Sequence, residues 1–159
     1  MIRRALGPLL WLALAPAVLC AASLVLRPQE WGPRPAGAGH RNTVYAYRQW
    51  QYTGLDQAQG EQVRQRAAGQ WQYSPYVGLH GPEGGGKPVT VSTYPMSNLN
   101  GGVLLGRIGE AGEPFYVGRG TTLFVTQPGR LYLRINDDLL GDNVGQLTIT
   151  VDVTPAAGD

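Results

Sequence analysis

Apolar and polar residues alternate most clearly near the C-terminal end of the chain. In Arg130–Ile135, every second residue is apolar, namely Leu131, Leu133 and Ile135. In Gln146–Val153, leucine, isoleucine and valine alternate in the same way with threonine and aspartate. Side chains two residues apart lie on the same face of a strand, so both segments are predicted to be half-buried antiparallel strands.

Similar short segments, bounded by Gly, Pro or Asn, recur upstream. The predicted strands are Thr43–Tyr52, Glu61–Ala68, Gly69–Tyr73, Gly102–Ile108, Pro114–Val117, Thr121–Thr126, Arg130–Ile135 and Gln146–Val153. The best helical window, Leu55–Ala68, contains Gly60 and few apolar residues. The pattern and the 23 glycines predict an all-β fold, a small antiparallel β-sandwich of jelly-roll type, with a closed barrel as the alternative. Gly81–Pro88 is predicted to be an exposed loop.

The N-terminal segment has a different composition. Arg3 and Arg4 precede an uncharged run from Ala5 to Leu26, which is long enough as a helix to cross a bilayer. The arginines predict a cytoplasmic N-terminus, hence an inner-membrane anchor with the rest of the chain in the periplasm. A cleaved signal peptide, cut near the small residues Cys20–Ser23, is the alternative and predicts secretion.

The sequence therefore divides into four parts. Residues 1–26 are the signal anchor or signal peptide, and residues 27–42 form a tether rich in Pro and Gly. Residues 43–153 form one β domain, and residues 154–159 form a short tail.

Composition excludes several kinds of site. Cys20 is the only cysteine, so residues 27–159 contain no disulfide, thiolate metal site or cysteine nucleophile. The net charge of +2 is too small to indicate a nucleic-acid partner. The exported part has two histidines, His40 and His80, which is poor evidence for zinc. No nucleophile-elbow sequence is present, and we expect a protein without catalytic activity.

The richest candidate chemistry lies in Asn136–Asn143, between the last two predicted strands. It contains Asp137, Asp138 and Asp142, with an Asn at each end. Two carboxylates about 5 Å apart repel by roughly 1 kcal/mol in water and about 3 kcal/mol near a dielectric of 20. A loop pinned at both ends can neutralise them with a hard cation, and calcium suits irregular oxygen ligands better than magnesium. An ordinary Asx-rich turn is the alternative.

A resemblance to a known family rests on six segments taken in order: Trp50–Leu55, Gln59–Val63, Ala67–Tyr73, Gly102–Gly109, Leu131–Asp137 and Asp142–Val151. Together they resemble the bacterial calcium-dependent galactophilic lectins of the PA-IL type. The resemblance covers about Val44–Val153. It implies a small β-sandwich with one calcium ion at its rim.

The resemblance also implies a set of ligands. For calcium these are the side chains of Asp137, Asp142 and Asn143 and the backbone carbonyls of Tyr73 and Leu139, with Leu140 or Gly141 as alternatives to Leu139. For the sugar, the implied contacts are Tyr73, Asp137, Asp142 and Asn143. Asp142 stands where the galactophilic lectin has Asn, and its extra charge is expected to strengthen cation binding.

The resemblance implies a galactose-like carbohydrate as the partner. The family's specificity loop does not match Gly84–Gly101, which offers Lys87, Tyr94, Met96, Asn98 and Asn100 instead. Two rival functions stay open. One is an envelope structural or partner-binding sandwich of the same fold without sugar binding, and the other is an accessory domain of an enzyme on another chain.

Overall fold

The computed structural model describes residues 39–90 and 92–156, and these form nine strands and one short helical turn. The expected N-terminal anchor and most of the tether lie outside the described residues. No helix within the described ranges is long and apolar enough to span a membrane.

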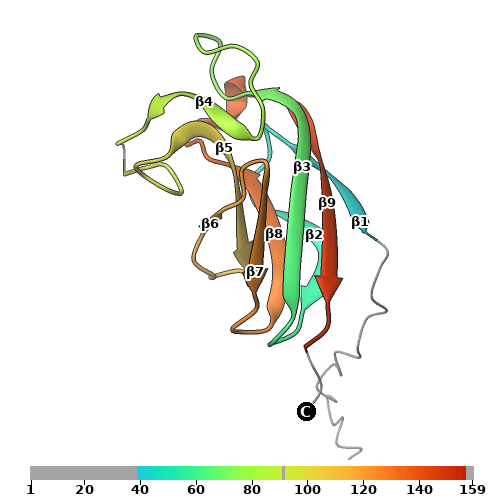
Figure 1. Ribbon diagram of the computed structural model, residues 1–159. Coiled ribbons are helices and arrows are strands. Elements are labelled where there is room, and N and C mark those ends of the chain that lie inside the picture. Colours follow the sequence, from blue (N-terminus) through green and yellow to red (C-terminus); the bar gives the residue numbers. More distant parts are fainter. Residues whose placement is uncertain (1–38, 91, 157–159) are drawn as a thin grey trace, which may run out of the picture. The chain divides into compact units, whose positions relative to one another are not determined.

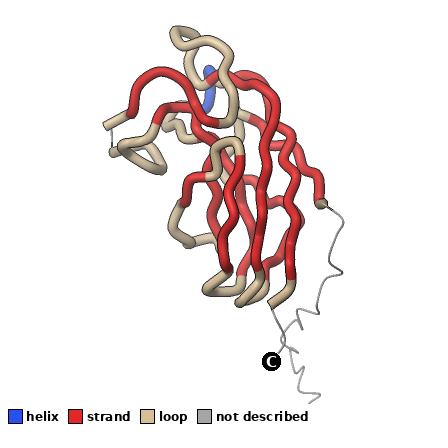
Figure 2. The backbone as a smooth tube through the Cα atoms, viewed as in Figure 1, coloured by secondary structure: helices blue, strands red, loops and turns tan. Residues whose placement is uncertain are grey.

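All strand pairs are antiparallel, and the strands form two sheets (Figures 1 and 2). The β9 sheet has the order β1-β9-β3-β7, made of β1 (His40–Tyr45), β9 (Val144–Thr154), β3 (Gln62–Gln72) and β7 (Gly120–Phe124). The β8 sheet has the order β2-β8-β5-β4, with β6 also paired to β5. Its strands are β2 (Gln51–Gln57), β8 (Gly129–Ile135), β5 (Asn100–Ile108), β4 (Glu83–Pro88) and β6 (Phe115–Tyr116). Two separate antiparallel sheets confirm the β-sandwich rather than the closed barrel.

The apolar core lies between the two sheets. The alternating residues of β8 and β9 are buried in it as predicted, including Leu131, Leu133, Ile135, Leu147 and Ile149. Their polar neighbours in sequence lie on the outer faces, because successive strand side chains point to opposite sides.

The predicted strand Thr43–Tyr52 is wrong, because the chain changes sheets within it. β1 pairs with β9, whereas β2 pairs with β8. The Gln51 side chain replaces a backbone pair at the crossing: its Nε2 donates to Tyr45 O (2.9 Å), and its Oε1 accepts from Tyr45 N (3.0 Å). Because a glutamine side chain makes this connection, the local sequence contains no Gly or Pro that would indicate the end of a strand.

Two further strand assignments differ. The segments split at Gly69 form one strand, β3, because Gly69 adopts a positive φ of 115° and keeps its pairing with Leu147. Gly81–Pro88, predicted to be a loop, contains β4, which pairs with β5. Glycine is poor in strands by propensity, but here it allows close backbone approach: a Cβ on Gly84 would lie 2.6 Å from Gly101 O.

The ends of the domain are also defined. β1 begins at His40, within the range expected to be a tether, and β9 ends at Thr154. The helical turn η1 (Leu140–Asp142) connects β8 to β9, and it lies at the same end of the sandwich as the β3–β4 loop (Figures 1 and 2). The acidic segment is therefore at one end of the sandwich.

Candidate functional site at the β8–β9 end

The end of β3 and the start of β9 bring distant residues together. Gln72 pairs with Val144 as the last pair of the β3–β9 ladder, so Tyr73 follows β3 beside Asn143. Asp137 follows β8 from the opposite sheet, and its carboxylate accepts a hydrogen bond from the Asn143 side chain. Three of the expected ligand residues thus meet where the two sheets approach each other.

Asp137 is a buried carboxylate, with only 2% of the residue exposed. Burial raises its pKa, and hydrogen bonds from Asn143, Tyr94 and the backbone N–H groups of Leu139 and Asp138 partly offset that rise. The backbone hydrogen bonds are those of an Asx turn, so the Asx-turn interpretation of this loop describes part of the site correctly. They do not satisfy the whole carboxylate.

Two acceptor oxygens at this point have no donor. Asp137 Oδ2 and Asn143 Oδ1 are both buried without a hydrogen-bond partner. The Asn143 amide is held in place because its Nδ2 donates to Ala46 O (3.1 Å). An unpaired buried acceptor costs about 1–3 kcal/mol, and two neighbouring oxygens of this kind are ligands that a hard cation prefers. These two oxygens are therefore of the chemical type that a calcium ion binds.

The other acidic residues do not converge on Asp137 in the expected way. Asp142 is exposed in η1, and Asp138 is exposed and accepts a hydrogen bond from Thr93. Within residues 39–90 and 92–156, no group of three or more His, Cys, Asp or Glu side chains is arranged to hold a metal ion. Repulsion among clustered carboxylates, which the sequence suggested as the reason to bind a cation, is therefore absent here. The electrostatic cost at this site comes from the burial of one carboxylate, that of Asp137.

Leu139 is the expected source of a second backbone ligand. Its side chain is 64% exposed, and its N–H is already directed at the Asp137 carboxylate. The segment therefore wraps closely around Asp137. The main chain of Tyr73 is brought to the same place by the β3–β9 register.

Arg134 contacts the backbone of Asp137 but does not neutralise the Asp137 carboxylate. Arg134 donates from Nη2 to the backbone oxygen of Asp137 (2.7 Å) and from Nε to Ile135 O (3.0 Å). Its Nη1 donates to Gln49 Oε1 (2.8 Å). No ion pair joins Arg134 to the Asp137 side chain among the described residues. The arginine thus positions the Asp137 backbone and leaves Oδ2 available.

The loop after β4 contributes residues that the sequence did not assign to the metal site. Tyr94 donates a hydrogen bond to Asp137, and burial followed by the Asp137 charge raises the pKa of the Tyr94 hydroxyl. The Asn136 amide pairs with Met96 on both sides, at 3.0 Å and 2.9 Å, and so acts as a structural clamp. A weak sequence signal existed for Tyr94, which lies in the segment where the family's specificity loop would fall.

The buried carboxylate predicts an unusual pH dependence of stability in the absence of metal. Because the folded-state pKa of Asp137 is raised above the ordinary aspartate value of 3.8, the folded state retains its proton to higher pH than the unfolded state. The stability that this proton uptake contributes is fully present below the ordinary pKa of aspartate and is lost as pH rises through the raised pKa of Asp137. We expect the free energy of unfolding of the wild type to fall, relative to that of Asp137→Asn, as pH rises. Urea unfolding of both proteins in chelator at several pH values measures this difference. A difference that stays constant with pH would contradict it.

Comparison with known proteins finds a likeness in structure only. No protein-family model matches the chain, and no curated protein sequence matches it. Among solved structures, the chain is similar to one described as "EclA N-terminal domain; PllA-like lectin", with 25% identity and a TM-score of 0.57. The match covers 72% of this chain and 95% of that one. The described domain thus has a lectin-like β-sandwich fold.

Proposed function

We propose that this chain is an exported, non-catalytic carbohydrate-binding module that depends on calcium. One observation carries the metal part of the proposal: the buried, donor-free oxygens of Asp137 and Asn143 lie where the two sheets meet. The carbohydrate part is supported by the similarity to a PllA-like lectin domain. The galactophilic resemblance of the sequence adds the expectation of a galactose-like sugar.

Five residues would hold the ion. Asp137, Asn143 and Asp142 would supply side-chain oxygens, and Tyr73 and Leu139 would supply backbone carbonyls. A bound calcium ion offers coordination positions that two vicinal sugar hydroxyls can fill in place of water.

The protein's own side chains would orient the sugar. Asp137 accepts hydrogen bonds, and a carboxylate acceptor makes shorter and stronger bonds to hydroxyls than a neutral one. Tyr94 and Tyr73 are half-buried around the same carboxylate and present ring surface to an apolar sugar face. Hydroxyl-for-water exchange is nearly balanced, so a single site is weak and several copies on one surface would be needed for avidity.

The N-terminal segment would determine where the module is located. Residues 1–26 would anchor the module in the inner membrane facing the periplasm, or would be cleaved to release it. A protein partner in the envelope would then decide which process the module serves.

The role of Asp142 can be tested against its neighbour. Asp142→Ala and Asp138→Ala each remove a charge and both carboxylate oxygens from an exposed position of one loop. If Asp142 is a ligand, its substitution should weaken calcium binding at least about tenfold, since hydrogen bonds and contacts to charged groups contribute about 1.5–3 kcal/mol. Asp138→Ala should change the affinity much less. Isothermal titration of the full chain with calcium measures both, and equal effects would remove Asp142 from the site.

Sugar binding needs its own measurement. A glycan array probed with the full chain in calcium and again in chelator should show signals only in calcium, with galactosides among them. Calcium binding without any glycan signal would instead favour the partner-binding sandwich.

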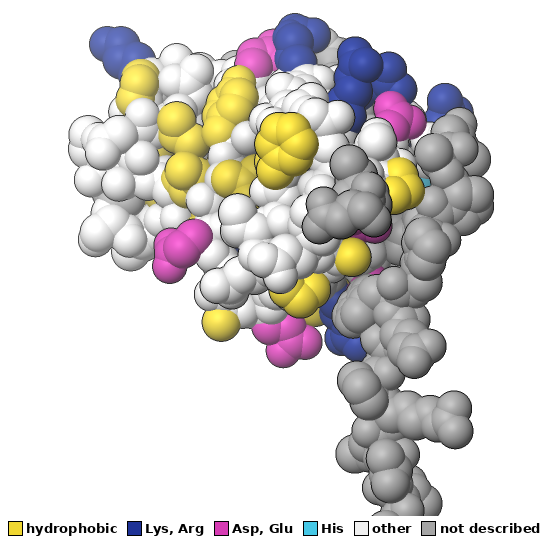
Figure 3. Space-filling view, turned by 60° about the horizontal axis from the view of Figure 1, so that its bottom comes forward, with side chains coloured by type: hydrophobic (Ala, Val, Ile, Leu, Met, Phe, Trp, Pro, Cys, Tyr) yellow, Lys and Arg dark blue, Asp and Glu magenta, His cyan; other side chains and the backbone are white. Residues whose placement is uncertain are grey.

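One feature favours that second function. Phe124 is 69% exposed and Tyr116 is also exposed, and both lie beside the half-buried Phe115 and Leu123 of β6 and β7. On the face that Figure 3 shows, several hydrophobic side chains are exposed among polar ones. Exposed apolar clusters are typical of protein-binding surfaces.

A further inference from the structure

The outer face of the β8 sheet carries three arginines and three aromatic residues in alternation. Tyr132 lies opposite Tyr52 of β2 on one side and Arg107 of β5 on the other. Arg130 and Arg134 flank Tyr132 on β8, and Trp50 precedes β2. These six side chains, the arginine-aromatic face, are not used by the calcium site except through the backbone contact of Arg134.

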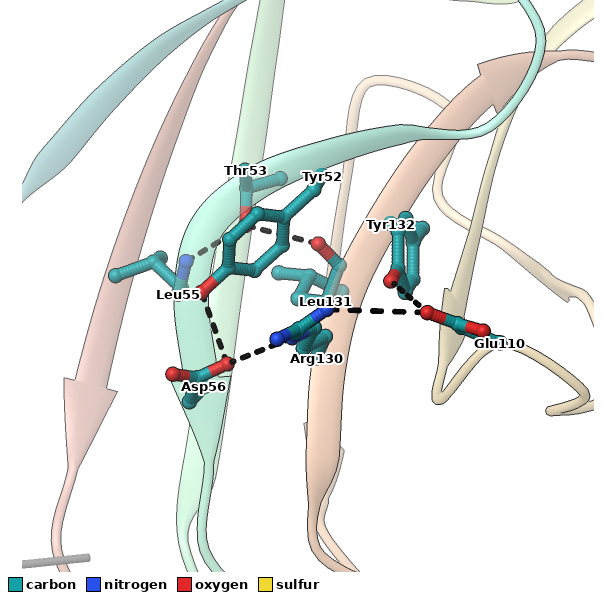
Figure 4. Close-up of polar contacts among 8 residues, drawn as sticks. All are labelled: Tyr52, Thr53, Leu55, Asp56, Glu110, Arg130, Leu131 and Tyr132. Atoms are coloured by element: carbon teal, nitrogen blue, oxygen red, sulfur yellow. Dashed lines mark hydrogen bonds and ion pairs between the residues drawn. The ribbon is translucent and has the colours of Figure 1, made fainter. Parts of the chain in front are cut away.

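The arginines differ in their partners. Arg130 lies between two carboxylates, with Asp56 Oδ1 at 3.9 Å from its Nε and Glu110 Oε1 at 3.8 Å from its Nη1 (Figure 4). Tyr52 donates to Asp56 (2.9 Å) and Tyr132 donates to Glu110 (3.3 Å). The positive charge at this end of the face is therefore balanced.

Arg107 has no such balance. Its guanidinium carbon lies 4.5 Å from the centre of the Trp50 ring and 5.2 Å from that of Tyr132. Within the part of the chain that the structure describes, it forms no hydrogen bond or ion pair, and its Nε is buried without an acceptor. Cation–π contact fixes the plane of the guanidinium but leaves its edge, where the N–H donors lie, unused.

Arg134 adds a second positive charge nearby. It is 7% exposed, and its guanidinium carbon lies 5.6 Å from the same Trp50 ring. Neither guanidinium group forms an ion pair within residues 39–90 and 92–156. Two neighbouring positive charges, one of them buried, favour an anion beside Arg107, because a buried charge is costly unless it is paired.

We propose that the arginine-aromatic face binds an acidic sugar, a uronic acid whose carboxylate pairs with Arg107. Because Nε is buried, the terminal Nη1 and Nη2 groups would make the two parallel hydrogen bonds to the carboxylate. The exposed ring of Tyr52 can pack against the pyranose, and Asp56 and Glu110 can accept further bonds from its hydroxyls. The two carboxylates would repel a polyanion. The face thus fits a ligand with one anionic group and several neutral hydroxyls.

This site uses neither Asp137 Oδ2 nor Asn143 Oδ1, so it does not depend on the calcium proposal. The test is titration calorimetry of the full chain in chelator, with methyl galacturonoside and methyl galactoside as probes. They share a sugar ring and differ at the carboxylate. The uronate should bind at least about tenfold more tightly, the value expected for a charge-assisted pair. Equal affinities, or binding of the uronate only when calcium is present, would overturn the proposal.

Variants locate the site. Arg107→Gln should abolish the preference for the uronate, and Arg64→Gln, which removes an exposed arginine from the β9 sheet, should leave it unchanged. Equal loss in both variants would overturn the assignment to Arg107. If Arg107→Gln does not fold, the wild-type protein gives the answer: the Arg107 Nε–H resonance, identified from Arg107→Lys, should shift on titration with uronate. Acetate binding as tightly as the uronate would overturn the assignment to a sugar.

Discussion

Asp137→Asn should raise the melting temperature in chelator and abolish any stabilisation by calcium. In the wild type without metal, folding buries a carboxylate whose Oδ2 has no donor, next to the equally unpaired Asn143 Oδ1. An asparagine at 137 has nearly the same shape, carries no charge and offers an N–H₂ group that can donate to Asn143. The substitution therefore removes an electrostatic penalty and satisfies an orphaned acceptor.

The same substitution removes the charge that calcium needs. At 100 times its dissociation constant, calcium should stabilise the wild type by about 2.7 kcal/mol. For a domain of this size that corresponds to roughly 10 °C or more. Thermal melting of the full chain, with and without calcium, measures both effects. Calcium stabilisation that persists in Asp137→Asn would place the ion elsewhere, and a wild type unaffected by calcium would remove the metal from the proposed function.

Gly102→Ala should destabilise the domain far more than Gly78→Ala. Both glycines have nearly the same positive φ, 76° and 78°, so both substitutions incur the backbone cost of about 1–2 kcal/mol. A Cβ on Gly102 would also overlap the His80 ring and approach Tyr73 Cδ1 at 2.7 Å, whereas a Cβ on Gly78 meets nothing within 4 Å. The difference between the two variants isolates the packing term.

That packing term bears on the site. Tyr73 and His80 pack with ring centres 5.5 Å apart, and the buried Trp71 donates from Nε1 to Gly102 O at 2.8 Å. Overpacking a tight site costs about 1–3 kcal/mol, so Gly102→Ala should lose about 2–5 kcal/mol in total. Urea unfolding of both variants measures the difference. Equal losses would mean that Tyr73 and His80 move aside freely.

The acidic segment shows how far local sequence could predict the site. The pattern placed Asp137 and Asn143 at strand ends on one rim, and the structure brings them together. The expected cause was repulsion among several carboxylates, but Asp138 and Asp142 are exposed. Which carboxylate of a short loop turns inward depends on donors that come from elsewhere in the chain. For Asp137 these include the side chain of Tyr94, more than forty positions upstream.

The strand errors have a similar origin. Gly81–Pro88 forms β4 only because Gly84 and Gly101 allow two backbones to approach, and Gln51 bridges a crossing that has no local signature. Strand periodicity, by contrast, was sufficient for β8 and β9, since their alternation matches the core directly.

The sequence by itself determined the all-β antiparallel class and the apolar face of the last strands, because burial of alternate side chains is a local, period-two property. Only the tertiary structure decided which polar atoms are left without partners, among them Asp137 Oδ2, Asn143 Oδ1 and Arg107 Nε. Whether a buried polar group is satisfied depends on side chains brought together from distant strands, and the pattern of any single segment carries no information about them.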